Sequence, residues 1–266
     1  MARWTALLFA SVLVAAGTGA LAAQESEVDL ELVLAIDVSR SIDGEEAQLQ
    51  RDGYVSAFRH PEVINAIRAG PAGRIAVTYV EWSGPTFQGV VVPWTIIANA
   101  EGSEAFAAQL AAAPIGREFG TSVSLGLAFA AEQFGGSELT SGRRVIDVSG
   151  DGPNNTGPPV TEVRDRIVAD GITINGLPLL LKEATTVSPY GIPDLDIYYE
   201  DCVIGGAGAF MITVADLANF DKAVRRKLVL EISASPPLLH RAAETVRTPR
   251  IDCMIGEKAR GLFFER

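Results

Sequence analysis

Two apolar stretches that each end in an acidic polar turn constrain the fold of this chain more than any other feature. Residues 30–37 (LELVLAID) are almost continuously apolar and run into a polar turn at 39–44. Residues 144–149 (RVIDVS) are followed in the same way by Asp151 in a turn rich in Gly and Asn. Such runs are typical of parallel strands that are buried on both faces. Asp37 and Asp151 are therefore expected just past two parallel strands, on one edge of a sheet.

Segments with the helical spacing of apolar residues separate these strands. Helices are predicted from Glu45, over 61–69, over 103–113, from Thr121 to Phe134, over 160–169 and from Asp216. Further strands are predicted at 74–82, 88–97, 172–177 and 209–214. Pro93 would be awkward in a central strand, so the second of these strands is expected to be an antiparallel edge strand. The fold class is thus α/β, an open, mostly parallel, doubly wound sheet with helices on both faces.

Residues 1–23 have the pattern of a secretory signal peptide. Arg3 precedes an apolar run at 7–16, and small residues follow up to a cleavage pattern at 20–22. The run is shorter than the roughly 20 residues of a membrane span. An uncleaved anchor is the alternative, but no basic cluster supports it. The mature chain is expected to be periplasmic or secreted and not inserted in a membrane.

The remaining chain is expected to form one domain, residues 28–235, followed by a C-terminal tail, residues 236–266. An exported chain meets an oxidising compartment, where Cys202 and Cys253 can form a disulfide that ties the tail to the domain. A disulfide and two free thiols both remain open from the sequence, because bonding requires the two residues to come close in space.

The net charge of −11 bears on the partners. An acidic chain is a poor ligand for nucleic acid and for anionic lipid. It suits cations and basic partners, although the charge is equally explained by solubility.

Oxygen-bearing side chains are grouped in the turn after the first strand. Asp37, Ser39 and Ser41 occupy alternate positions, which lets all three point to one side. Carboxylate and hydroxyl oxygens suit Mg²⁺, Ca²⁺ or Mn²⁺ better than Zn²⁺ or Cu²⁺. Thr121 and Asp151 would add a third hydroxyl and a second carboxylate from two other loops.

This combination resembles the metal-ion-dependent adhesion site of von Willebrand factor A domains. The resemblance covers about residues 30–232 and extends in particular to an uncharacterised family of exported bacterial proteins. It implies that Asp37, Ser39, Ser41, Thr121 and Asp151 hold a divalent cation, Mg²⁺ first and Ca²⁺ or Mn²⁺ next. It also implies a partner protein whose acidic side chain completes the coordination. The function expected is therefore metal-dependent protein binding of the adhesion type, without catalysis.

Two other functions remain open. A metal-assisted hydrolase would use the same cation to activate water and needs a general base, for which Asp43 is the nearest loop acid. Asp43 also fits a helix cap. The other possibility is a scaffold with a structural metal. The sequence contains no GxSxG motif and no P-loop, and its two histidines, His60 and His240, form no HExxH motif.

Overall fold

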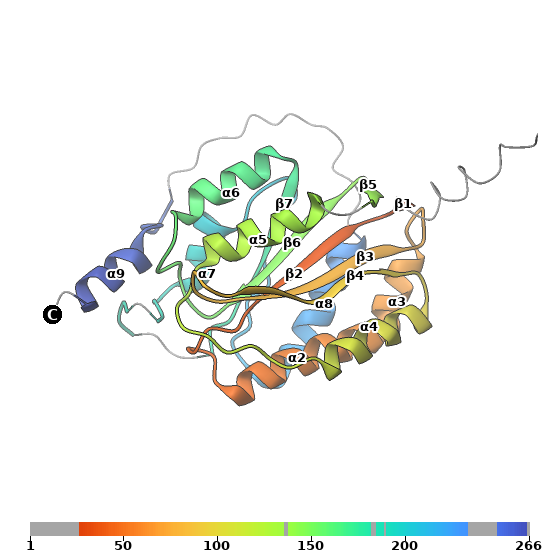
Figure 1. Ribbon diagram of the computed structural model, residues 1–266, viewed down its shortest axis with the longest axis horizontal. Coiled ribbons are helices and arrows are strands. Elements are labelled where there is room, and N and C mark those ends of the chain that lie inside the picture. Colours follow the sequence, from red (N-terminus) through yellow and green to blue (C-terminus); the bar gives the residue numbers. More distant parts are fainter. Residues whose placement is uncertain (1–26, 136–137, 182–184, 189, 234–248, 265–266) are drawn as a thin grey trace, which may run out of the picture.

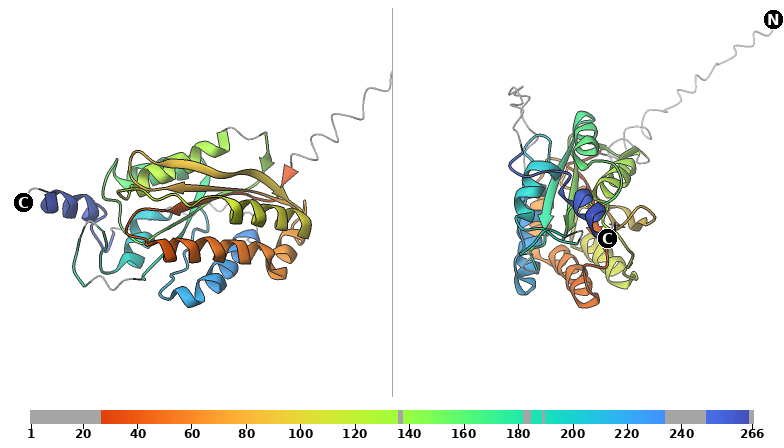
Figure 2. Two further views of the ribbon diagram at one scale, coloured as in Figure 1. Left: turned by 60° about the horizontal axis from the view of Figure 1, so that its bottom comes forward. Right: turned by 90° about the vertical axis from the view of Figure 1, so that its left-hand side faces the viewer.

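A computed structural model describes residues 27–264 except 136–137, 182–184, 189 and 234–248. The predicted signal peptide and His240 lie outside the described residues. A central sheet is covered by helices on both faces (Figures 1 and 2). Among the described residues, no helix has the length and apolar character needed to cross a membrane.

The main sheet has five strands in the order β4-β3-β2-β6-β7. Their bounds are β2 Glu31–Asp37, β3 Ile75–Trp82, β4 Gln88–Ile97, β6 Arg144–Gly150 and β7 Ile172–Pro178. All neighbouring strands are parallel except β3 and β4, which are antiparallel. The predicted antiparallel edge strand is thus confirmed, with Pro93 in β4 at the edge. Two short strands, β1 (Glu27–Val28) and β5 (Thr140–Ser141), pair separately.

Two groups of helices sandwich the sheet, and alternation along β2 supplies both cores. Leu32 and Leu34 pack on one side, while Val33 and Ala35 pack on the other. The first side is covered by α2 (Gly44–Arg59), α3 (Pro61–Arg68), α4 (Ala100–Ala112) and α8 (Phe220–Ser233), with the 3₁₀ turn η2 (Leu217–Asn219) ahead of α8. The second side is covered by α5 (Val123–Gly135), α6 (Val160–Ala169), α7 (Leu195–Tyr198) and the π-helix η1 (Tyr199–Val203). The doubly wound architecture is therefore confirmed.

Local sequence signals fix several helix starts. Asp43 accepts hydrogen bonds from the backbone N–H groups of Glu45 and Glu46, and Glu46 accepts one from Asp43 N, so α2 begins with a capping box. Pro61 opens α3 as predicted, because proline needs no hydrogen-bond acceptor in a first helical turn. The helix α4 begins at Ala100 rather than 103, since Asn99 caps it.

The prediction of a strand over residues 209–214 is wrong, because this segment does not form a regular strand. This segment runs beside β7 through two isolated parallel bridges, at Met211 and Val214. Ile212 N donates to Gly176 O and Val214 N donates to Pro178 O. Pro178 has no N–H to return a bond to the segment, so the ladder is interrupted there.

The C-terminal part of the chain is tied back to the domain. Cys202 in η1 and Cys253 form a disulfide, with their Cα atoms 5.5 Å apart. The helix α9 (Ile255–Phe264) follows directly and projects beyond one end of the sheet (Figures 1 and 2). The disulfide that the sequence left open is thus present, and the helix α9 follows it within the C-terminal segment.

Candidate metal site

The turn after β2 forms the first loop of the site. Asp37 is the last residue of the strand and is almost fully buried. Ser39 N donates a 2.7 Å hydrogen bond to Asp37 Oδ1, which folds the chain back over the carboxylate. The hydroxyl oxygens of Ser39 and Ser41 lie 2.9 Å apart, so both face the same side as predicted. Three oxygen-bearing side chains therefore converge within five residues.

Asp37 keeps one carboxylate oxygen without a hydrogen-bond partner among the described residues. This atom, Oδ2, is buried, and burying an unpaired charged oxygen is costly. Burial, reinforced by the nearby Asp151 carboxylate, raises the pKa of Asp37 well above its usual value. An oxygen in this condition is suited to accept a cation.

The turn after β6, residues 151–159, forms the third loop of the site and brings Asp151 to the first loop. Ser41 Oγ donates a 2.7 Å hydrogen bond to Asp151 Oδ1. The two strands are paired in register up to Ile36 and Ser149, which places Gly150 beside Asp37. A Cβ on Gly150 would lie 3.0 Å from Asp37 Oδ2 and 2.8 Å from Tyr199 Oη, so a side chain would crowd the site. The close approach of the two acidic loops thus depends on glycine at this position.

Thr121 lies on a second loop that adjoins the other two. Arg40 N donates to Glu118 O and Glu118 N donates to Val38 O, which pairs this loop with the first. Thr121 itself is buried, two residues before α5 begins at Val123. The loop that carries Thr121 therefore contacts the first loop through Glu118, and Thr121 itself contacts Asn155 in the turn after β6. The four other predicted residues are joined by hydrogen bonds, whereas Thr121 is held through its backbone.

Two asparagines of the third loop form hydrogen bonds that hold the second loop in place. Asn155 Oδ1 accepts a hydrogen bond from Thr121 N, and Asn155 N donates to Thr121 O. Asn154 Oδ1 accepts from Ser124 N in the first turn of α5. Both asparagines are buried. Neither asparagine could be identified from the sequence, because adjacent amides in a Gly- and Pro-rich turn are common turn formers and give no local signal of these contacts.

The helix α9 packs against the third loop. Asn154 Nδ2 donates a 2.7 Å hydrogen bond to Glu257 Oε1. A Cβ on Gly256 would lie 2.1 Å from Asn154 O, so the helix backbone approaches closely. The Cys202–Cys253 disulfide anchors this helix two residues before it begins. The C-terminal segment therefore supports the third loop.

A buried ion pair supports the start of the second loop. The guanidinium of Arg51 in α2 contacts the carboxylate of Glu81 at the end of β3, and both side chains are buried. Arg51 also donates to Ala113 O, and Glu81 Oε2 accepts a 2.8 Å hydrogen bond from Gly116 N. The pair thus fixes the backbone that leads towards Thr121.

The donor set fits a hard divalent cation. It consists of two carboxylates and three hydroxyls, all oxygen ligands of the type that Mg²⁺, Mn²⁺ and Ca²⁺ prefer. Within the part of the chain that the structure describes, no three His, Cys, Asp or Glu side chains form a metal-binding group. The unpaired Asp37 Oδ2 is the atom that a cation would satisfy.

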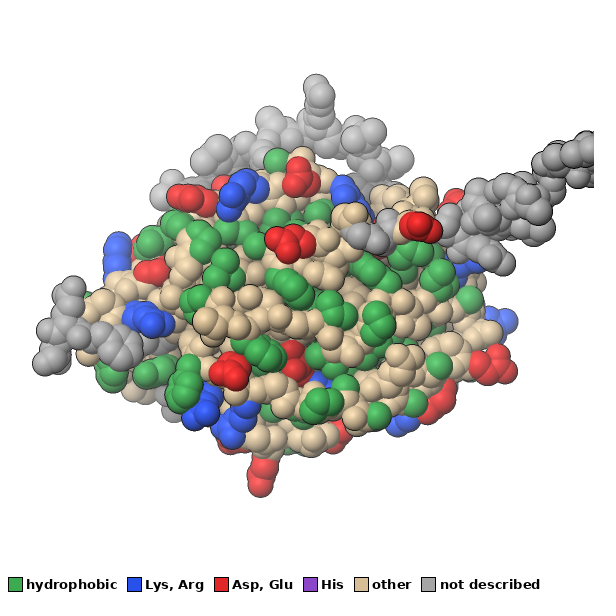
Figure 3. All heavy atoms as spheres, in the orientation of Figure 1, with side chains coloured by type: hydrophobic (Ala, Val, Ile, Leu, Met, Phe, Trp, Pro, Cys, Tyr) green, Lys and Arg blue, Asp and Glu red, His purple; other side chains and the backbone are tan. Residues whose placement is uncertain are grey.

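The surface of the molecule shows no large area of one charge on the face drawn in Figure 3, where acidic and basic side chains alternate with hydrophobic ones. Close to the site, Arg40 lies over the ring of Phe119, with Cζ 3.8 Å from the ring centroid. Phe119 is 68% exposed, so an aromatic residue stands at the rim between the first and second loops.

Comparison with solved structures supports the fold. Proximal thread matrix protein 1 from the mussel byssus matches with a TM-score of 0.56 and 15% identity, over 78% of this chain and 49% of that protein. Another structure of the same protein is described as having a zinc-occupied MIDAS motif. The pilus adhesin SpaC from Lactobacillus rhamnosus GG matches with a TM-score of 0.58 and 12% identity, over 77% of this chain and 31% of the adhesin.

A third match is named for the domain itself. It is the von Willebrand factor type A protein from Catenulispora acidiphila, with a TM-score of 0.52 and 14% identity, over 77% of this chain and 43% of that protein. The chain spans less than half of each of these three proteins. No curated protein sequence matches it.

The match to a family model covers residues 27–236, which is most of the chain. Its description is "Protein of unknown function (DUF1194)". The matched region contains all five predicted site residues and ends before Cys253 and α9. The chain therefore belongs to the DUF1194 family, and its domain has the fold of von Willebrand factor A domains.

Proposed function

We propose that this chain is an exported protein-binding module whose binding depends on a divalent cation. Asp37, Ser39, Ser41, Thr121 and Asp151 hold the cation, and a carboxylate of a partner protein completes its coordination. The observation that carries the proposal is the buried, unpaired Asp37 Oδ2 within a cluster of oxygen side chains from the loops after β2 and β6. The structural neighbours named as a matrix protein and a pilus adhesin support the same type of function.

The charge balance of the site favours an external acidic ligand. Two carboxylates neutralise a divalent cation without giving the site an excess of negative charge. Mg²⁺ takes six oxygen ligands in near-octahedral geometry and keeps water where the protein supplies none. Five side chains leave at least one position, which an Asp or Glu of a partner would take from water.

Export agrees with the chemistry of the chain. The N-terminal pattern is that of a signal peptide, and the Cys202–Cys253 disulfide suits an oxidising compartment. We therefore place the module in the periplasm or outside the cell.

The hydrolase alternative receives less support. Its nominated general base, Asp43, accepts hydrogen bonds from the first turn of α2 and is committed to capping that helix. The only histidine among the described residues, His60, caps α3 through its Nδ1 atom. The other alternative is a scaffold domain whose metal is only structural. One experiment distinguishes the binding module, the hydrolase and the scaffold.

The experiment uses Mn²⁺ as a paramagnetic probe. Electron spin resonance is expected to show one Mn²⁺ bound per chain, and the relaxation of water protons should reveal at least one bound water. Acetate should displace that water if the open position accepts a carboxylate. Turnover of p-nitrophenyl phosphate would favour the hydrolase. A bound Mn²⁺ without exchangeable water would favour a structural metal and contradict the proposal.

A further inference from the structure

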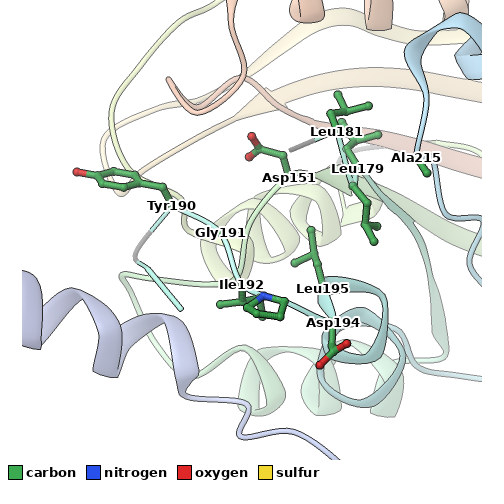
Figure 4. A pocket seen from close by; sticks show the side chains of 11 residues that line it. Asp151, Leu179, Leu181, Tyr190, Gly191, Ile192, Asp194, Leu195 and Ala215 are labelled. Carbon is green, nitrogen blue, oxygen red and sulfur yellow. The ribbon is translucent and has the colours of Figure 1, made fainter. Parts of the chain in front are cut away.

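A cavity of about 500 Å³ opens directly beside the candidate metal site. Asp151 lines it at one edge. The rest of the wall comes from residues 179–181 directly after β7, from the loop before α7 with Leu195 at the start of that helix, and from Ala215. Figure 4 shows Asp151 near Leu179 and Leu181, with Ile192 and Leu195 across the opening. Metal site and cavity therefore share a residue and form one continuous surface.

The side chains that line the cavity are apolar except for Tyr190 and two acidic residues. Leu179, Leu181, Ile192 and Leu195 supply aliphatic surface, and the charged lining residues are Asp151 and Asp194. The size falls in the range of ligand pockets, which are mostly apolar with few polar groups. This wall suits an aliphatic side chain and repels a carboxylate when no cation is present.

Exposed aromatic residues continue the surface beyond the cavity. Tyr190 is 55% exposed at the cavity rim, and its ring contacts that of Phe263 in α9 with 6.0 Å between centroids. Phe119 is exposed on the second loop. Exposed apolar residues next to a polar site are typical of protein-protein interfaces. This extent favours a polypeptide over a small molecule.

We propose that the cavity binds an aliphatic side chain of the partner protein, adjacent in sequence to the acidic residue that reaches the cation. This proposal rests on the proposed function and adds the sequence preference of the partner: an Asp or Glu flanked by Leu, Ile or a residue of similar shape. The charged side chains that line the cavity are both acidic and repel the carboxylate of such a segment. The segment can therefore bind only after the cation has bound.

Three blocked tripeptides test the preference. Acetyl-Leu-Glu-Leu-amide has an aliphatic residue on each side of the acid and so presents one in either chain direction. Acetyl-Ser-Glu-Ser-amide lacks the aliphatic groups, and acetyl-Leu-Gln-Leu-amide lacks the charge. Dissociation constants are measured by nuclear magnetic resonance titration of the disulfide-intact protein, with saturating Mg²⁺ and with EDTA. Burial of one Leu side chain predicts about tenfold tighter binding of the Leu-Glu-Leu peptide than of the Ser-Glu-Ser peptide, in Mg²⁺ only.

Two variants locate the effect. Ala215→Phe fills the cavity and should reduce the advantage of the Leu-Glu-Leu peptide to about twofold or less, with Mg²⁺ affinity measured in parallel. Ala218→Phe is the matched control, because Ala218 is exposed and does not line the cavity. The control should keep the full advantage.

The outcomes separate this proposal from the proposed function. Equal affinity of the Leu-Glu-Leu and Ser-Glu-Ser peptides, both dependent on Mg²⁺, would overturn the cavity proposal and leave the metal-dependent function standing. Absence of Leu-Glu-Leu binding to Mg²⁺-saturated protein would overturn it as well. Binding of 4-methylpentanoate as tight as that of the peptide would assign the cavity to a small aliphatic acid instead. Failure to bind Mg²⁺ at all would overturn the proposed function itself.

Discussion

Ser41 Oγ donates a 2.7 Å hydrogen bond to Asp151 Oδ1 across a sequence separation of 110 residues. The contact joins the loops that follow β2 and β6, two strands that lie side by side in the sheet. The two loops that carry the acidic residues are therefore in direct contact, which brings Asp151 to the side chains of the first loop.

Replacement of Ser41 tests whether its hydroxyl belongs to the binding site. Ser41→Ala removes one proposed ligand and the bond to Asp151. We expect Mg²⁺ affinity to fall at least about tenfold, while the free energy of unfolding changes by about 1 kcal/mol or less, since Ser41 is only half-buried. Calorimetric titration and urea denaturation measure the two quantities. Unchanged affinity would remove Ser41 from the site.

The contact between Asn155 and Thr121 predicts a role for a residue that is not a proposed ligand. Asn155→Ala removes the acceptor of the Thr121 N–H group and should loosen the second loop. Supporting residues around metal sites change affinity by about 10- to 100-fold, and we expect a loss of Mg²⁺ affinity in this range. The exposed Asn219→Ala is the control. Equal affinities in both variants would mean that Thr121 needs no such support.

The disulfide should stabilise both the domain and the third loop. It joins residues 51 positions apart, and a loop of this size corresponds to about 3–4 kcal/mol of stabilisation. The double variant Cys202→Ala, Cys253→Ala is expected to unfold at a lower urea concentration and to bind Mg²⁺ more weakly, because α9 no longer holds Asn154. Equal metal affinity in the variant and the wild type would show that α9 does not support the site.

A buried charge cluster away from the site predicts the pH dependence of stability. Lys227 Nζ lies 2.6 Å from Asp147 Oδ1 and 2.5 Å from Glu231 Oε1, and all three side chains are buried. Burial, and then the charge of Glu231, raise the pKa of Asp147 from 3.8 to about 7. The folded state therefore keeps a proton that the unfolded state releases between these values.

It follows that stability should fall as the pH rises from about 4 to about 7 and then level off. One proton bound only by the folded state gives at most about 1.4 kcal/mol per pH unit. Urea denaturation between about pH 5 and about pH 8 measures the slope. Asp147→Asn should show a shallower slope than the wild type. Identical slopes would mean that Asp147 is ionised throughout.

The sequence alone predicts the parts of the site that follow from local patterns. Asp37 and Asp151 could be placed because apolar runs mark buried strands and polar turns mark their ends. Thr121 could be placed because it precedes a helical pattern. The supporting residues could not be predicted. Asn154, Asn155 and Glu257 act through contacts between segments far apart in the chain, and their local sequences resemble ordinary turns and helices.

The fold was predictable to the same extent. The mostly parallel, doubly wound sheet and its antiparallel edge agree with the expectation, since they follow from apolar periodicity and from Pro93. Residues 209–214 have a strand-like composition, but the missing N–H of Pro178 interrupts the pairing with β7. The prediction of a strand at 209–214 failed because the local sequence of this segment does not show which residues of β7 it would pair with.

The most direct test of the central claim is calorimetric titration of Mg²⁺, Ca²⁺ and Mn²⁺ into the metal-stripped, disulfide-intact chain. Asp37→Ala is titrated beside it, with Asp43→Asn as a control in the adjacent turn and circular dichroism to verify folding. The account predicts one saturable site per chain in the wild type and in Asp43→Asn, and none in folded Asp37→Ala. Binding that persists unchanged in Asp37→Ala, or saturable binding in none of the three proteins, would contradict it.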